Sequence, residues 1–181
     1  ANKLKRPVKM RLDRDDDFVI TGKRHPFSYD YTVGFDDTGR ILGLHVVQLA
    51  DCGHSADLSG PVADRAVFHT DNAYFLEHVR IDSYRCKTHK QSHTAFRGFG
   101  GPQGMIVTET LLGDIARQLG LDPLVVRERN FYGTTDRNTT HYGTTITDNI
   151  VQPLVSQLAH DCQYTQRRAE IQAWNENQTT L

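Results

Sequence analysis

The chain has 181 residues, of which 38% are hydrophobic and 24% are charged. This size and composition predict one folded piece, residues 1–181, with a hydrophobic core of its own. Because 21 Lys and Arg balance 22 Asp and Glu, the charge gives no support to binding of nucleic acid or acidic membranes. No apolar run reaches membrane-spanning length, and the three separated cysteines favour free thiols in a cytoplasmic protein.

The N-terminal half reads as antiparallel β-structure. Apolar and polar residues alternate at 8–12 and again at 27–35, as in half-buried strands. Turn-forming residues at 36–39 separate the second of these strands from a returning strand at 41–50, which predicts a hairpin. A further alternating strand is expected at 79–83.

The junction after the first expected strand is acidic. Asp15, Asp16 and Asp17 interrupt the strand pattern. The apolar Phe18–Ile20 then leads into a turn at Thr21-Gly22.

The second half of the chain is predicted to be helical, after one short helix that starts at residues 57–61. Gly120 suits the end of a long helix, and Asp122-Pro123 suits the cap and first position of the next. The expected fold class is α+β, with antiparallel hairpins first and packed helices afterwards. The helices are expected from about 101 to 120, from 123 towards 130, at 154–162 and at 164–174, with a turn-rich stretch at 133–147.

The most unusual stretch is Thr94–Gln103, which holds two aromatic residues, one arginine and three glycines in front of a helix. Glycine permits positive φ or close approach of a ligand, and the first N–H groups of a helix suit a polar or anionic partner. The glycine spacing matches neither a phosphate-binding P-loop nor a dinucleotide motif. A tight turn is therefore an alternative, with Arg97 on the surface and Phe96 and Phe99 in the core.

Two other features are weaker. Arg65 lies in a predicted helix, where most arginines are solvated or paired. Cys86, His89 and His93 have spacing that resembles a metal site, but no convincing fourth ligand lies beside them. Zinc binding at these three residues remains an alternative at this level.

The run Thr94–Gly104 resembles the signature of the molybdenum-binding part of the xanthine dehydrogenase/oxidase family. The sequence of residues Leu58–Arg65 is similar to that of the bacterial molybdenum subunit of this family. The resemblance covers essentially the whole chain. It continues through Arg6–Lys9, Ile20–Pro26, Asp57–Ser59, Asp64–His69, Asp71–Tyr74 and Arg127–Tyr132.

The resemblance implies a parent enzyme, a molybdenum hydroxylase, that oxidises xanthine and hypoxanthine to urate with a molybdenum–molybdopterin cofactor. Its implied partners are the purine substrate and the remaining xanthine dehydrogenase domains or subunits, where FAD and 2Fe-2S clusters are expected. The general-base glutamate and the main molybdopterin-binding segments of the family have no counterpart in this chain. We therefore expect an interior fragment of the molybdopterin cofactor-binding region, inactive by itself.

The resemblance also implies residue roles. Arg65 falls at the catalytic arginine that faces the carbonyl edge of the substrate, and Phe99 falls at the phenylalanine that stacks on the purine. Arg97 falls where the backbone lies against the molybdenum centre. The cofactor cradle is implied to include Phe96, Gly98 and Gly100 beside Arg97.

Two other functions stay open from the sequence. An aldehyde oxidase-like enzyme, or another hydroxylase of N-heterocycles, would carry the same cofactor with a different pocket. A non-catalytic interaction domain would use the glycine stretch only as a turn and Arg65 only as a surface residue.

Overall fold

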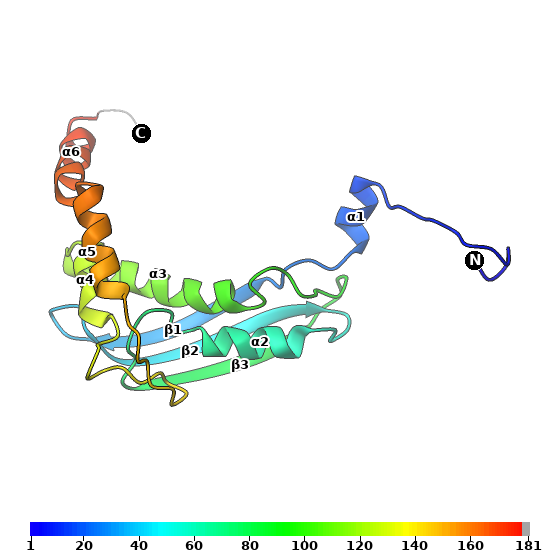
Figure 1. The fold of residues 1–181 in the computed structure, drawn as a ribbon, viewed down its shortest axis with the longest axis horizontal. Helices are drawn as coiled ribbons and strands as arrows, with labels where there is room; N and C mark the ends of the chain where they lie inside the picture. Colours follow the sequence, from blue (N-terminus) through cyan, green and yellow to red (C-terminus); the bar gives the residue numbers. More distant parts are fainter. Residues whose placement is uncertain (179–181) are drawn as a thin grey trace. The chain divides into compact units, whose positions relative to one another are not determined.

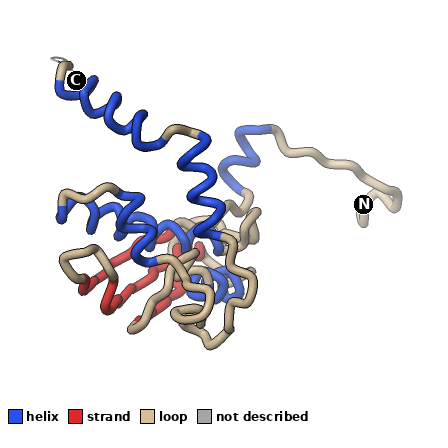
Figure 2. Tube along the Cα trace, turned by 60° about the vertical axis from the view of Figure 1, so that its left-hand side comes forward, coloured by secondary structure: helices blue, strands red, loops and turns tan. Residues whose placement is uncertain are grey.

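A computed structural model describes residues 1–178. The chain divides into two compact units, which are described separately: the first comprises residues 1–33, 44–72 and 79–110, and the second comprises 34–43, 73–78 and the chain from 111 onward. The elements, labelled in Figure 1 and coloured by type in Figure 2, are α1 (Arg14–Ile20), β1 (Phe27–Phe35), β2 (Ile41–Gly53), α2 (Ser59–Phe68), β3 (Val79–Lys87), α3 (Gly101–Leu119), α4 (Pro123–Asn130), α5 (Val151–Asp161) and α6 (Tyr164–Glu176).

The sheet has the order β1-β2-β3 and is mixed. The hairpin of β1 and β2 is confirmed, and β3 forms at the expected place. However, β3 runs parallel to β2, in register from Leu44 opposite Val79 to Ala50 opposite Arg85. The prediction of antiparallel hairpins alone is therefore wrong for β3. The reason is the connection: α2 lies between β2 and β3 and packs on β3, and such a crossover returns the chain in the same direction (Figure 1).

A buried threonine joins the elements of the first unit. Thr70, just after α2, donates its hydroxyl to the carbonyl of Ala66 at 2.9 Å and accepts the side-chain amide of Gln48 on β2 at 2.7 Å. Thr108 of α3 donates to the Thr70 carbonyl. All four residues are fully buried. The end of α2 is thus fixed to both β2 and α3.

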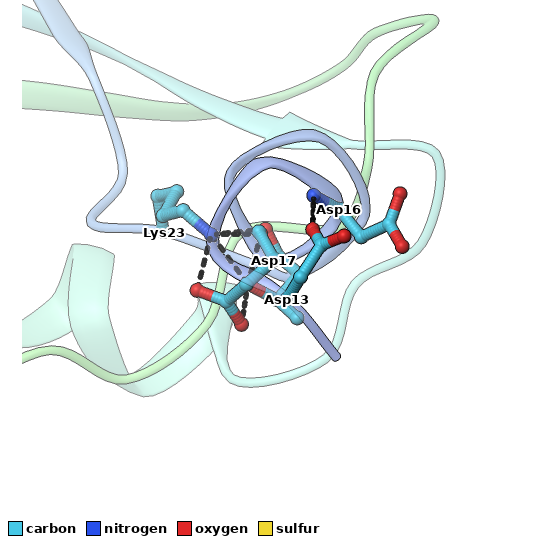
Figure 3. Close-up of polar contacts among 5 residues, drawn as sticks. Asp13, Asp16, Asp17 and Lys23 are labelled. Atoms are coloured by element: carbon cyan, nitrogen blue, oxygen red, sulfur yellow. Dashed lines mark hydrogen bonds and ion pairs between the residues drawn. The ribbon is translucent and has the colours of Figure 1, made fainter. Parts of the chain in front are cut away.

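The first twenty residues differ from the sequence-based expectation. Residues 8–12 form no strand, because an alternating pattern needs a neighbouring strand and none pairs with them in the described chain. The acidic stretch instead begins α1: the Asp13 carboxylate accepts the N–H of Asp16 at 2.9 Å (Figure 3). Carboxylates in a first turn favour a helix. Near the C-terminal end of α1, the Lys23 ammonium donates to the backbone carbonyl of Asp17 at 2.8 Å (Figure 3).

The helix end at Gly120 and the helix start at Asp122-Pro123 are confirmed in the second unit. Gly120 has φ of +65°, as a residue that ends a helix should. The carboxylate of Asp122 accepts the N–H of Leu124 at 2.8 Å, and Pro123 occupies the first turn of α4. Helices α5 and α6 follow at the expected places.

The hairpin turn between β1 and β2 is completed by α4. Asp36 and Arg40 close the turn, with the Asp36 N–H donating to the Arg40 carbonyl at 3.0 Å. Asn130, fully buried at the end of α4, accepts the N–H of Ile41 at 2.9 Å and donates to the Gly39 carbonyl at 2.8 Å. A single side chain therefore fixes both sides of the turn.

Helix α6 retains apolar surface. Tyr164 and Arg168 both contact the carboxylate of Asp122, at 2.9 and 3.0 Å. Ile171 and Trp174, further along the helix, are more than half exposed. None of the helices in the described part of the chain is long and apolar enough to cross a membrane.

Candidate cofactor-binding bend and its arginine-bearing helix

The stretch singled out in the sequence forms a bend with three consecutive residues in the left-handed region. Gly98, Phe99 and Gly100 have φ of +92°, +50° and +99°, and α3 begins at the next residue. A phenylalanine in this conformation costs on the order of 1–3 kcal/mol, and such strain concentrates at functional sites. We call residues 96–101 the bend from here on.

Backbone hydrogen bonds close the bend but leave several of its N–H donors unused. The N–H of Phe99 donates to the carbonyl of Phe96 at 2.8 Å, and the N–H of Gly101 donates to the carbonyl of Gly98 at 2.9 Å. Within residues 1–178, the N–H groups of Phe96, Arg97, Gly98 and Gly100 donate to no acceptor. Arg97 and Gly98 lie at the exposed centre of the bend, so their successive N–H groups are free to bind a ligand.

Close packing against α2 explains one glycine of the bend. A Cβ on Gly100 would lie 2.0 Å from the Val62 carbonyl oxygen and 3.1 Å from the Ala66 nitrogen. A Cβ on Gly104, in the first turn of α3, would lie 2.2 Å from the Ala66 oxygen. The backbones of the bend and of α2 are thus in direct contact. Any side chain larger than that of glycine at position 100 or 104 would push them apart.

Arg65 lies on the exposed side of α2 and carries an uncompensated charge. Its neighbour Asp64 pairs with Arg85 of β3 at 3.6 Å, while the Arg65 guanidinium forms no ion pair among the described residues. It borders an open depression of about 430 Å³. The depression is lined by Pro61, Asp64, Arg65, Phe68 and His69.

The two aromatic residues of the bend border a different hollow. Phe96 is 53% exposed, whereas Phe99 is half-buried. Both line a narrow crevice with no room for a water molecule. The structure therefore brings Arg65 and Phe99 onto two elements that touch, α2 and the bend, but it does not place them in one cavity. Arg97 projects an exposed side chain from the bend.

A buried polar layer supports the bend from behind. The His25 ring contacts the Ser59 hydroxyl at 2.8 Å, and the Gln103 amide donates to the His25 carbonyl at 3.3 Å. The Tyr29 hydroxyl in turn donates to the Gln103 carbonyl at 2.6 Å. This layer links the start of β1 to the first turns of α2 and α3.

Burial controls ionisation in this layer. Burial, and then the nearby ring of His93 at a centroid distance of 5.9 Å, lower the pKa of His25 below its ordinary value. Burial likewise raises the pKa of Tyr29. Sequence reasoning assigned no role to His25, Tyr29 or Gln103, although His25 lies in the family-like run Ile20–Pro26 and Gln103 in the run Thr94–Gly104.

The alternative zinc site is not formed. Across residues 1–178, no group of three or more His, Cys, Asp or Glu side chains comes together in a way that could hold a metal ion. Cys86 and His89 lie in and just after β3, while His93 is buried with neither ring nitrogen hydrogen-bonded.

These features define a class of protein. A strained bend with free N–H groups opens a helix and packs on a second helix that bears an unpaired arginine. This arrangement suits a domain that holds a polar or anionic cofactor through its backbone.

Comparison with known proteins identifies the family. Residues 1–131 match the molybdopterin cofactor-binding domain, and the chain belongs to that family. It is 40% identical over 177 residues to xanthine dehydrogenase of Calliphora vicina, which covers 98% of this chain and 13% of the relative. It is 44% identical over 172 residues to xanthine dehydrogenase 1 of Arabidopsis thaliana, which covers 95% of this chain and 12% of the relative. The resemblance to the molybdenum-binding part of the xanthine dehydrogenase family is therefore confirmed.

Solved structures agree with this assignment. Quinoline 2-oxidoreductase from Pseudomonas putida 86 matches with a TM-score of 0.74 and 28% identity, over 95% of this chain and 23% of that chain. Aldehyde oxidoreductase from Desulfovibrio gigas matches with a TM-score of 0.74 and 26% identity, over 82% of this chain and 16% of that chain. The chain thus spans about an eighth of the length of its curated relatives.

Proposed function

We propose that the full-length protein containing this chain is a molybdenum hydroxylase that oxidises xanthine and hypoxanthine to urate. In this proposal the chain contributes one side of the purine pocket and part of the cofactor cradle. The observation that carries it is the bend itself: two free N–H groups, at Arg97 and Gly98, lie on a segment packed against the helix of Arg65. The similarity to xanthine dehydrogenases, at 40–44% identity in the relatives above, supports the choice of a purine substrate.

The residues of the bend fit a molybdopterin cofactor. Such a cofactor presents oxygen and sulfur acceptors, and the N–H groups of Arg97 and Gly98 are donors without a partner in the described chain. Gly98 adds no side chain beside these donors. When bound, the cofactor supplies the two-electron redox chemistry by which a ring carbon is hydroxylated.

Arg65 has the charge and exposure needed to bind the carbonyl edge of a purine. Asp64 is engaged by Arg85 and does not pair with Arg65. A guanidinium stays charged across the physiological pH range and donates in a fixed plane. In the proposed role Arg65 binds the substrate carbonyl and stabilises the negative charge that develops there during hydroxylation.

Phe99 supplies a flat surface for the heterocycle. Its positive φ is held by the bond to the Phe96 carbonyl and by the two flanking glycines, so its ring direction is set by the backbone. Stacking of a ring on Phe99 would contribute about 0.5–1.5 kcal/mol beyond the burial of area. We place the opposing aromatic wall, the general-base glutamate, FAD and the 2Fe-2S clusters elsewhere in the full-length protein.

Replacement of Arg65 tests the proposal. In the full-length protein, Arg65→Met should lower kcat/KM for xanthine by about 30- to 1,000-fold, equivalent to about 2–4 kcal/mol of transition-state stabilisation. Arg80→Met is the matched control, because Arg80 is an exposed β3 residue paired with Asp82. Wild-type kinetics in Arg65→Met would remove Arg65 from the substrate site.

A substrate screen separates the proposal from its main alternative. The structural similarity to an aldehyde oxidoreductase and to quinoline 2-oxidoreductase favours testing aldehydes and N-heterocycles beside xanthine. A purine enzyme should prefer xanthine, and Arg65→Met should affect aldehyde turnover less than xanthine turnover, because an aldehyde has no second carbonyl to bind. Preference for aldehydes in the wild-type protein would support the alternative.

A further inference from the structure

Three successive carbonyls of the bend, those of Phe96, Arg97 and Gly98, each accept a hydrogen bond. Backbone N–H groups within the bend hold the carbonyls of Phe96 and Gly98. The carbonyl of Arg97 differs, because it accepts a hydrogen bond from the side chain of Arg24, at 2.6 Å, across 73 positions of sequence. Arg24 thus supplies a constraint that the backbone of the bend does not.

The Arg24 side chain makes a second contact with the bend, at Phe96. Its guanidinium carbon lies 4.5 Å from the centroid of the Phe96 ring, which is the geometry of a cation–π contact. It forms no ion pair with a carboxylate in the described part of the chain, and its second terminal nitrogen, Nη1, is buried without a hydrogen-bond partner. The contacts seen for Arg24 are therefore those of a residue that orients a backbone segment.

The segment that carries Arg24 is itself fixed beside the bend. The N–H of Thr94 donates to the carbonyl of Lys23 at 3.1 Å. One residue earlier, a Cβ on Gly22 would lie 2.3 Å from the Ser92 carbonyl oxygen, so the backbones of these two segments are in direct contact. The backbone next to Arg24 is therefore fixed beside the bend independently of the bond from Arg24 to Arg97.

We propose that Arg24 is a positioning residue that sets the direction of the free N–H group of Gly98. In a trans peptide the C=O and the N–H point to opposite sides. Because Arg24 holds the Arg97 carbonyl on one side, the N–H of Gly98 is directed to the other, where no acceptor among residues 1–178 meets it. This inference rests on the proposed function, in which that N–H faces the cofactor.

The proposal distinguishes arginine from lysine at position 24. A lysine ammonium keeps the charge and can donate to the Arg97 carbonyl, but it lacks the planar group that stacks on Phe96 and donates at a fixed angle. Arg24→Met removes the donor altogether. Arg24→Lys should therefore give an intermediate phenotype.

The experiment uses the full-length protein with Arg24→Met, Arg24→Lys and the control Arg80→Met. The readouts are molybdenum bound per polypeptide, the Mo(V) electron paramagnetic resonance spectrum and the thermal unfolding midpoint. We expect Arg24→Met to lose at least half of the molybdenum and to shift or broaden the Mo(V) signal. Arg24→Lys should change both less, and Arg80→Met should match the wild type.

The outcomes separate this inference from the proposed function. Wild-type molybdenum content and spectrum in Arg24→Met would overturn the positioning role; if Arg24→Met is insoluble, the same result in Arg24→Lys overturns it. A wild-type protein that binds no molybdenum, or an Arg65→Met variant with unchanged kinetics, would instead overturn the proposed function. Sensitivity to Arg65→Met with indifference to Arg24→Met rejects only this inference.

Discussion

The turn at Gly39 and the bend at Gly98–Gly100 both place glycine at positive φ, but they use their backbone groups differently. In the second unit, the Gly39 N–H donates to the Asp36 carbonyl at 2.9 Å, and Asn130 holds the Gly39 carbonyl. In the first unit, the carbonyls of Phe96, Arg97 and Gly98 accept hydrogen bonds, while the N–H groups of Arg97 and Gly98 meet no acceptor in the described chain.

This difference separates a structural turn from a candidate binding segment. Glycine content and positive φ are common to both and say nothing about a ligand. The informative observation is where the hydrogen bonds of each segment go, because a free donor beside a strained backbone has a cost that a ligand offsets. The predictions below test whether the two segments differ in function as well as in hydrogen bonding.

Asn130→Ala should give the largest loss of stability. It leaves the buried N–H of Ile41 and the carbonyl of Gly39 without partners, at a cost of about 2–5 kcal/mol. The thermal unfolding midpoint of the full-length protein should fall, while the molybdenum content of the folded fraction stays at the wild-type level. Asn138→Ala is the control, because the side-chain amide of Asn138 donates to the Ile146 carbonyl at a long distance of 3.5 Å. Specific loss of molybdenum in Asn130→Ala would break the comparison.

Alanine at the two glycines should have unequal effects. In Gly100→Ala the new Cβ meets the Val62 backbone oxygen, and with the positive φ we expect a loss of about 2–4 kcal/mol. In Gly39→Ala the nearest atoms, at 3.1 and 3.3 Å, belong to the Val126 side chain, which has more freedom to move. About 1–2 kcal/mol is expected there. Thermal unfolding of both variants measures which of them loses more stability. A larger loss in Gly39→Ala than in Gly100→Ala would contradict the prediction.

Acid should lower the stability of the loop that follows β3 and leads into the bend. The expected loss is smaller than that of the glycine variants. Burial acts to raise the pKa of Asp51, but hydrogen bonds from Lys90 at 2.7 Å and from Thr88 outweigh it and lower the pKa to about 2. Because the folded-state pKa is depressed, the contribution is present above about pH 4 and is lost as the pH falls towards 2. Solvent screening limits it to about 1 kcal/mol.

Asp51→Asn measures this contribution. At neutral pH the variant should be less stable than the wild type by about 1 kcal/mol, and the difference should shrink as the pH falls through the window from 4 to 2. A difference that is independent of pH would show that the carboxylate charge of Asp51 does not hold the loop.

Local patterns predicted much of the fold. The hairpin at 27–53, the cap at Asp122 and the helix end at Gly120 follow from alternation and from capping chemistry, which act between close neighbours in sequence. Residues 8–12 show the limit of this reasoning. Alternation describes a strand that has a partner, and pairing is decided by another segment.

The direction of β3 depended on α2 in the same way, since the crossover rather than the strand sequence decides between parallel and antiparallel pairing. The candidate site shows a related limit. Arg65 and Phe99 were identified through the family resemblance, but Arg24 acts on Arg97 from 73 positions away. Nothing in the local sequence of Arg24 distinguishes it from a surface arginine.

The most direct test of the central claim is a crystal structure of the full-length protein with its cofactor bound. The account predicts that the N–H of Arg97 or Gly98 lies within hydrogen-bonding distance, about 3.5 Å, of a cofactor atom, with the Arg97 carbonyl still bound by Arg24. It further predicts that a bound purine stacks on Phe99. If both N–H groups instead met acceptors from another segment of the protein, the bend would be a structural turn like the one at Gly39, and the account would be wrong.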